Sequence, residues 1–325
     1  MARRRRSRLP LLAVVLVAIA AGVWVLGGWY AAGPLERQTE FDVGEGEGLS
    51  ALADDLQATG AVKSATLFKL RAKVLGGGTE VKAGSFLLPK GVSEATILEI
   101  LKGDKVIRRL ITIPEGMPSV MVVDRLMANK DLIGPVAVPE DGSILPDSYD
   151  WQKGETRAAV LKRMQSAMDK TLAELWAKRT PRTVAKTPQE ALILASIVEK
   201  ETGKPEERQM VAGLYSNRLR QGMLLQADPT IIYPITRGKP LGRRIRQSEI
   251  QAVNGYNTYT MVGLPKGPIT NPGRDSIAAV LNPAETNALF MVADGTGGHV
   301  FADTLSQHNA NVAKWFALRK ARGDM

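Results

Sequence analysis

The chain has 325 residues, 44% of them hydrophobic and 23% charged, a composition that allows about two globular domains with substantial cores. It contains no cysteine and only two histidines, which excludes disulfides and cysteine nucleophiles and argues against a zinc hydrolase. The net charge is +10, but half of this excess comes from five arginines among the first eight residues, so it gives little reason to expect a nucleic-acid partner. We expect no metal ion or cofactor.

A charge-free apolar segment follows these arginines, over residues 9–32. About 20 apolar residues suffice for a helix to cross a bilayer. The positive-inside rule then places the arginine-rich residues 1–8 in the cytoplasm and the rest of the chain on the far side. We therefore predict a transmembrane helix over 9–32. A cleaved signal peptide is the alternative, which the length of the apolar segment disfavours.

Two further parts are predicted beyond this helix, in an α+β fold. Residues 33–105 indicate a small strand–helix module, in which FDVGEGEGLSALADDLQATG predicts a strand, a glycine turn and a helix capped by Ser50. A related pattern, LPKGVSEATILEILKG, has Ser93 at the capping position. Residues 106–325 indicate a larger mixed domain, with a clearly amphipathic surface helix over 156–179.

The segment 187–203 predicts an unusual helix. Its start, TPQE, is a capping box with proline at the first helical position, and ALILASIVEKET follows before a glycine. The first two turns are apolar all round, which indicates burial. Near the end stand Glu199 and Glu201, whose directions differ by about 200° around the helix axis. They cannot form a facing pair, so if one is chemical the other is structural.

A carboxyl group in the last turn of a buried helix has two reasons to stay protonated. Burial disfavours the anion, and so does the negative end of the helix dipole. Both raise the pKa of such a group, as a general acid working near neutral pH requires. The structural alternative is a buried ion pair, for which Arg218 in the next helix is a candidate.

Three downstream segments carry polar side chains between turns. LQADPTIIYPI holds Gln226 and Asp228, GYNTYTMVGLPKGPITNPG holds Asn257 and Tyr259, and VADGTGGHVFADT holds His299. Tyrosine and asparagine offer the stacking faces and neutral hydrogen bonds that suit a sugar. A turn aspartate, an ordered loop and a hydrogen-bonded structural histidine are the alternatives. The sequence has no G-x-S-x-G segment, no P-loop and no serine–lysine motif of penicillin-binding enzymes.

LASIVEKET, NRLRQGMLLQADPTIIY, YNTYTMVGLPKGPITNPG and VADGTGGHVF, in this order after an apolar helix, resemble the endolytic murein transglycosylases of the YceG-like family. The resemblance covers nearly the whole chain from residue 9. It implies cleavage of the β-1,4 bond between N-acetylmuramic acid and N-acetylglucosamine within nascent glycan strands, without water, leaving 1,6-anhydro ends that terminate elongation. It also implies a LysM-like module over 33–105, a catalytic domain over 106–325 and a link to peptidoglycan synthases, the penicillin-binding proteins.

The resemblance further implies a location and a set of site residues. The chain is expected in the bacterial inner membrane as a single-pass protein, with its catalytic domain in the periplasm. The catalytic glutamate is expected at the first position of the motif, Glu199, acting as acid and then as base toward the sugar's own 6-hydroxyl. The second glutamate, Glu201, also matches the motif, but its opposite direction on the helix indicates a scaffold role. The expected substrate-binding residues are Gln226, Asp228, Asn257, Tyr259, His299 and Arg218.

Two other functions stay open at this point. A two-carboxylate glycoside hydrolase would use Glu199 as acid and Asp228 as base or nucleophile, and would leave reducing ends. A membrane-anchored cell-wall binding protein would do no chemistry and would lose nothing on substitution of Glu199 by glutamine.

Overall fold

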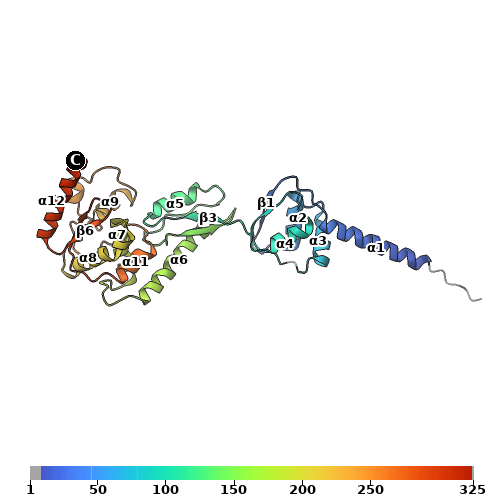
Figure 1. The fold of residues 1–325 in the computed structure, drawn as a ribbon, viewed down its shortest axis with the longest axis horizontal. Coiled ribbons are helices and arrows are strands. Elements are labelled where there is room, and N and C mark those ends of the chain that lie inside the picture. Colours follow the sequence, from blue (N-terminus) through green and yellow to red (C-terminus); the bar gives the residue numbers. More distant parts are fainter. Residues whose placement is uncertain (1–8, 45, 79, 324–325) are drawn as a thin grey trace, which may run out of the picture. The chain divides into compact units, whose positions relative to one another are not determined.

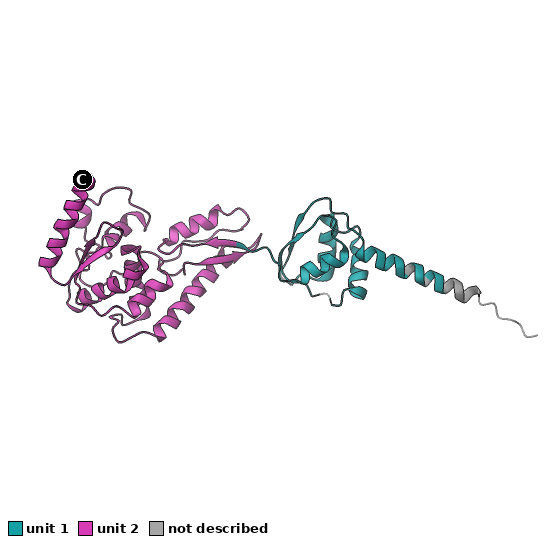
Figure 2. Ribbon diagram, in the orientation of Figure 1, with its two compact units in different colours: residues 1–109 teal, residues 110–325 magenta. Residues whose placement is uncertain are grey.

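The computed structural model describes residues 9–44, 46–78 and 80–323, and the chain divides into two compact units, Met1–Arg109 and Leu110–Met325 (Figure 2). The sequence predicts this boundary at 105/106, four residues earlier than the structure has it. The fold is mixed α+β, and the described residues form helices and small sheets of two strands each (Figure 1). The expected cytoplasmic tail, residues 1–8, lies outside the described residues.

The first helix, α1 (Leu9–Tyr30), belongs to the first unit. Several of its apolar side chains are exposed, with exposed fractions of 69% for Val17 and 66% for Val23. Trp29, near its end, is buried and packs on Phe68 with ring centroids 6.2 Å apart. Counting only the residues and side chains that the structure describes, none of the helices combines the length and the apolar character needed to cross a membrane.

The rest of the first unit is a two-stranded sheet with helices. Strand β1 pairs antiparallel with β2, so that Phe41 lies opposite Phe86, and both rings are buried. Ser93 caps α4 as predicted, accepting a hydrogen bond from the Thr96 N–H at 3.2 Å. The Ser50 cap is wrong, because α2 begins at residue 49 behind Gly48 and places Ser50 inside its first turn. The elements are β1 (Thr39–Val43), α2 (Leu49–Ala58), α3 (Ala65–Leu75), β2 (Gly84–Leu88) and α4 (Glu94–Lys102).

The second unit surrounds one buried helix, α7, with other helices and two small sheets (Figure 1). The predicted amphipathic helix is α6, whose buried face includes Met164 and Met168. The elements are β3 (Arg109–Thr112), α5 (Ser119–Ala128), β4 (Ser148–Trp151), α6 (Arg157–Ala177), α7 (Pro188–Glu201), η1 (Pro205–Glu207), α8 (Arg208–Arg220), α9 (Asp228–Thr236), α10 (Gln247–Ile250), α11 (Arg274–Leu281), β5 (Phe290–Ala293), β6 (His299–Ala302) and α12 (Leu305–Arg322).

Helix α7 forms as the sequence predicts. Thr187 caps it, accepting from the Glu190 N–H at 3.1 Å, and Pro188 occupies the first turn. Every residue over 191–198 is buried, because α6, α8, α9 and α11 pack around the helix. The capping box is incomplete, since the Glu190 carboxylate accepts from the N–H of Lys186 and not from that of Thr187. The helix ends at Glu201, where Thr202 turns to an extended backbone.

Candidate active site

A polar cavity of about 250 Å³ lies beside the C-terminal end of α7. Five of the six expected substrate-binding side chains line it, and Asn257 does not. Of the two glutamates at the end of α7, Glu201 lines the cavity and Glu199 does not. The lining residues are Glu201, Leu214, Tyr215, Arg218, Leu225, Gln226, Asp228, Tyr259, Met291, Val292, Ala293 and His299.

Glu201 has the environment of a carboxylic acid that keeps its proton. Its Oε1 atom is fully buried and has no hydrogen-bond partner among the described residues. Burial, followed by the negative charge of Asp228, raises the pKa of Glu201 to about 7, against the opposing effects of Tyr215 and Arg218. A pKa in this range leaves a substantial share of the group protonated at neutral pH, which suits a general acid.

Glu199 points into different surroundings on another face of α7. Its side chain is only 6% exposed, and its Oε2 accepts the Gly273 N–H at 2.9 Å. The Arg208 Nη2 lies 4.0 Å from its Oε1 and donates to Glu115 Oε2 at 2.8 Å. The anion of Glu199 is therefore paired inside the protein, and it joins the start of α8 and the start of α11 to the end of α7.

Asp228 and Tyr259 form a hydrogen-bonded pair in the cavity. The Tyr259 hydroxyl donates to Asp228 Oδ1 at 2.6 Å. Asp228 is the first residue of α9, where the helix dipole favours a negative charge. Burial, and then the bond to Asp228, raise the pKa of Tyr259, so its hydroxyl stays a donor. The pair places a carboxylate, held in one position, in the same cavity as Glu201.

Arg218 organises the wall of the cavity. Its side chain is buried, and its Nε donates to the Leu289 carbonyl at 2.7 Å while Nη1 donates to the Leu225 carbonyl at 2.8 Å. These bonds join the chain before β5 to the turn before α9. In that turn Gln226 has φ +53°, a left-handed backbone that costs a non-glycine residue roughly 1 kcal/mol or more. Strained backbone conformations of this kind are common at functional sites, and this one lies in the turn whose residues Leu225, Gln226 and Asp228 line the cavity.

His299 is held by a carboxylate behind it. Its Nδ1 lies 2.8 Å from Glu207 Oε2, and its backbone N–H donates to Glu207 Oε1 at 2.9 Å. The Thr202 hydroxyl also donates to this carboxylate, at 3.2 Å. Burial alone would raise the pKa of Glu207, but these hydrogen bonds lower it below its ordinary value. Because the anion can only accept, Nδ1 carries the proton and Nε2 stays available to a ligand.

Asn257 has a structural role in place of the expected contact with substrate. It is completely buried, its Nδ2 donates to the carbonyls of Ile250 and Ala252 at 2.9 and 2.8 Å, and its Oδ1 accepts the Tyr259 N–H at 3.0 Å. Nearly all of its hydrogen-bonding capacity is used by the backbone. Asn257 therefore fixes the loop that presents Tyr259 to the cavity.

Tyr215 is a site residue that the sequence did not single out. It is 2% exposed, lines the cavity and affects the pKa of Glu201. The available signal was its spacing from Arg218, because residues three apart share a face of α8. In the described part of the chain, no group of three or more histidine, aspartate or glutamate side chains could hold a metal ion.

The fold and the cavity together define an α+β protein in which a buried helix delivers one carboxylic acid to a polar surface cavity. Residues 41–314 match the YceG-like family, and the chain belongs to that family. It is similar to the endolytic murein transglycosylase of Bacillus subtilis (strain 168), with 25% identity over 344 residues, 92% of this chain and 93% of that protein.

A second relative is the endolytic murein transglycosylase of Streptococcus pneumoniae serotype 2 (strain D39 / NCTC 7466). The identity is 28% over 328 residues and covers 86% of this chain but 58% of the relative, so the chain spans less than two thirds of that protein's length. The fold is shared with a crystal structure of a YceG-like protein from Listeria monocytogenes, at a TM-score of 0.53, 22% identity, and coverage of 84% of this chain and 98% of that chain.

Proposed function

We propose that this chain is a peptidoglycan lytic transglycosylase that cleaves glycan strands internally, between N-acetylmuramic acid and N-acetylglucosamine, and leaves 1,6-anhydro ends. The observation that carries the proposal is Glu201, a single carboxyl group with a pKa near 7 in a polar cavity. The pneumococcal and Bacillus relatives, both endolytic murein transglycosylases, support the reaction. One acid suffices, because the substrate's own 6-hydroxyl replaces the water that most glycosidases activate with a second carboxylate.

The reaction uses Glu201 twice. Its proton passes to the glycosidic oxygen as the bond to C1 of the muramic acid breaks, and the glucosamine leaves with a hydroxyl group. The resulting anion then accepts the proton of the 6-hydroxyl as that oxygen bonds to C1, which restores the acid. The negative charge of Asp228, held by Tyr259, stabilises the positive charge that develops on the sugar between the two steps.

This proposal moves the acid from Glu199 to Glu201. The two residues share the end of α7, but Glu199 is already paired with Arg208 and the Gly273 N–H and is not part of the cavity. We propose that Glu199 anchors the end of the helix so that Glu201 keeps its direction. Gln226, Arg218 and His299 complete the binding surface, with Arg218 acting mainly through the backbone that it holds.

A two-carboxylate hydrolase is the second candidate, because Asp228 lines the same cavity as Glu201. In that mechanism Asp228 would activate water or attack the sugar directly. The products separate the two mechanisms, since hydrolysis leaves reducing ends and lytic cleavage leaves anhydro ends.

We also propose that residues 9–32 anchor the chain in the inner membrane, with the remainder in the periplasm. The support is the charge-free apolar sequence behind five arginines, together with exposed apolar side chains such as Val17 and Val23 on α1. The order β1-α2-α3-β2 supports a LysM-like glycan-binding module over 33–105. Anhydro ends cannot be extended, so we further propose that the protein terminates glycan elongation beside penicillin-binding synthases.

The test digests purified glycan strands with the full chain in detergent and reads the fragment ends by mass spectrometry. The expected result is internal fragments with anhydro ends, a loss of about a hundredfold or more for Glu201→Gln, and a loss within about tenfold for the matched Glu199→Gln. Full activity in Glu201→Gln, or selective loss in a folded Glu199→Gln, would return the acid to Glu199. Reducing ends would establish the hydrolase.

A further inference from the structure

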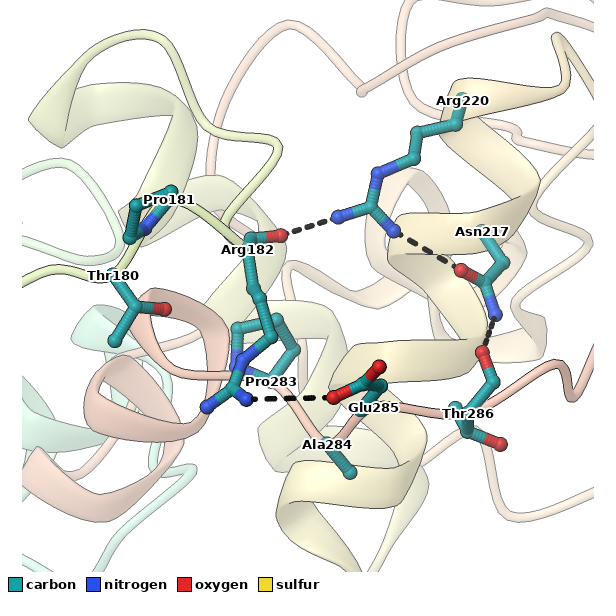
Figure 3. Close-up of a pocket in the computed structure, with 9 residues that line it drawn as sticks. All are labelled: Thr180, Pro181, Arg182, Asn217, Arg220, Pro283, Ala284, Glu285 and Thr286. Atoms are coloured by element: carbon teal, nitrogen blue, oxygen red, sulfur yellow. Dashed lines mark hydrogen bonds and ion pairs between the residues drawn. The ribbon is translucent and has the colours of Figure 1, made fainter.

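A second cavity lies on the other side of α8 from the candidate active site. Its volume is about 590 Å³, and it is formed by the segment after α6, by α8 and by the segment after α11 (Figure 3). Helix α8 contributes Arg218 to the first cavity and Arg220 to the second, because residues two apart on a helix point about 200° away from each other. None of the chemistry proposed above uses this second cavity.

The guanidinium of Arg220 lies between the Arg182 carbonyl and the Asn217 side chain, which are both neutral groups (Figure 3). Nη1 donates to Asn217 Oδ1 at 3.0 Å, and Nη2 donates to the backbone carbonyl of Arg182. Asn217 is fixed in turn by the Thr286 carbonyl at 2.7 Å. Among the described residues, the hydrogen-bond acceptors of the Arg220 guanidinium are these two neutral oxygens, and no ion pair joins it to a carboxylate. A guanidinium has five N–H donors, so this one is oriented, positively charged and not neutralised.

Arg182 supplies a second guanidinium on the opposite wall. Its Nη2 donates to Asn282 Oδ1 at 2.6 Å, and its Nη1 lies 4.0 Å from Glu285 Oε2. The Glu285 side chain is 89% exposed, so this ion pair is long, solvated and weak. Glu285 therefore acts as an internal anion that a better-placed carboxylate can displace.

We propose that this cavity binds a carboxylate group of the peptide stems of peptidoglycan, with Arg220 and Arg182 as its ligands. The identity of the ligand rests on the proposed function, because the peptide stems of that substrate carry free carboxylates. Guanidinium groups pair with carboxylates through two parallel hydrogen bonds, which gives direction as well as affinity. Pro181 and Pro283 add apolar wall for the aliphatic parts of a peptide. The site makes the enzyme prefer strands that still carry their stems.

The test titrates a synthetic stem peptide with free carboxylates into the full chain in detergent, by isothermal titration calorimetry. We expect saturable binding, a loss of about tenfold or more in Arg220→Gln, and binding a few-fold tighter than wild type in Glu285→Gln, because the competing anion is gone. Arg179→Gln is the matched control, since Arg179 lies next to the cavity wall but stacks on Trp176 at 4.2 Å. The same peptide with its carboxylates amidated should not bind.

Three outcomes would overturn the proposal: no binding of the free peptide, equal binding of the amidated peptide, or equal effects of Arg220→Gln and Arg179→Gln. A misfolded variant would not bind the peptide more tightly than wild type, so the tighter binding expected for Glu285→Gln cannot come from misfolding. Glu201→Gln should bind the peptide as wild type does, so the measurement needs no cleavage. Peptide binding without glycan cleavage would sustain this site and refute the proposed function, whereas cleavage without peptide binding would do the opposite.

Discussion

The hydroxyl of Tyr259 donates a 2.6 Å hydrogen bond to Asp228, and the carboxylate of Asp228 in turn raises the pKa of Glu201. Burial is the larger cause of the raised pKa of Glu201, and the carboxylate of Asp228 is the next. The carboxylate that we propose to stabilise positive charge on the sugar therefore also favours the protonated form of Glu201. One pair of side chains thus supports both halves of the proposed reaction.

The first prediction concerns the pH dependence of cleavage in Asp228→Asn. A general acid acts in its protonated form, so the rate falls as pH rises through the pKa of Glu201, about 7. Removing the charge of Asp228 lowers that pKa, so the fall in rate should move to lower pH. Initial rates of anhydro-end formation between about pH 5 and 9 give the profile.

The matched control for this measurement is Asp124→Asn, which removes an exposed carboxylate paired with Lys239. Its profile should coincide with that of the wild type. An unmoved or upward-shifted profile in Asp228→Asn would mean that Asp228 does not influence the acid.

The second prediction is that Glu201→Gln gains stability relative to wild type as pH rises. The pKa of Glu201 is about 7 in the folded chain against an ordinary 4.5. Its contribution to the stability of the fold is therefore fully present below pH 4.5 and is lost as pH rises through 7. The difference is about 3 kcal/mol between pH 4.5 and 8. Glutamine does not titrate, so the free energy of unfolding of the wild type should fall by about 3 kcal/mol relative to that of the variant over this pH range. Hydrogen exchange of the α7 amides at pH 5 and 8 measures it, and a constant difference between the two proteins would contradict it.

The sequence is sufficient to predict α7 but not to choose between its two glutamates. The cap, the burial and the end of the helix follow from residues close to one another, and the separation of Glu199 from Glu201 follows from helix geometry. Which of the two meets a cavity depends on α9 and on the β5–β6 hairpin, which arrive from distant parts of the chain. No local pattern encodes that packing.

Asn257 shows a second limit of the same kind. Its residue type and its loop suit a sugar ligand, but three backbone carbonyls, those of Glu249, Ile250 and Ala252, use its amide group. The sequence shows which donors and acceptors a side chain has. Only the folded loop shows which of them remain free. Tyr259, two residues further on, does reach the cavity, so neighbouring residues of one motif differ in role.

The third prediction concerns the cation behind Glu199. Arg208→Met removes the cation that lies 4.0 Å from Glu199, whose side chain is only 6% exposed, and this should cost about 3 kcal/mol or more. Adding Glu199→Gln should restore part of the loss, because the buried charge is then gone. Lys239→Met, which breaks an exposed ion pair with Asp124, should cost less than about 1 kcal/mol. Hydrogen exchange of α7 at pH 7 compares the variants, and equal losses for Arg208→Met and Lys239→Met would contradict the role given to Glu199.

The fourth prediction concerns the carboxylate that orients His299. Glu207 accepts from both the Nδ1 and the backbone N–H of His299, one on each oxygen. Glutamine has one acceptor oxygen, so in Glu207→Gln one of these donors loses its partner, and the ring shifts from the Nδ1–H toward the Nε2–H tautomer. A lost hydrogen bond to a charged group should lower the cleavage rate about tenfold.

Nitrogen-15 NMR of the His299 ring separates this orienting role from a general loss of structure. The wild type should show the Nδ1–H tautomer, and Glu207→Gln should show a larger share of the other one while His308 stays unchanged. Glu206→Gln is the control, because Glu206 is the exposed neighbour of Glu207 in η1. An Nε2–H tautomer in the wild type would refute the assignment, since Nδ1 could then not donate to Glu207 and the nitrogen left for a ligand would be a donor.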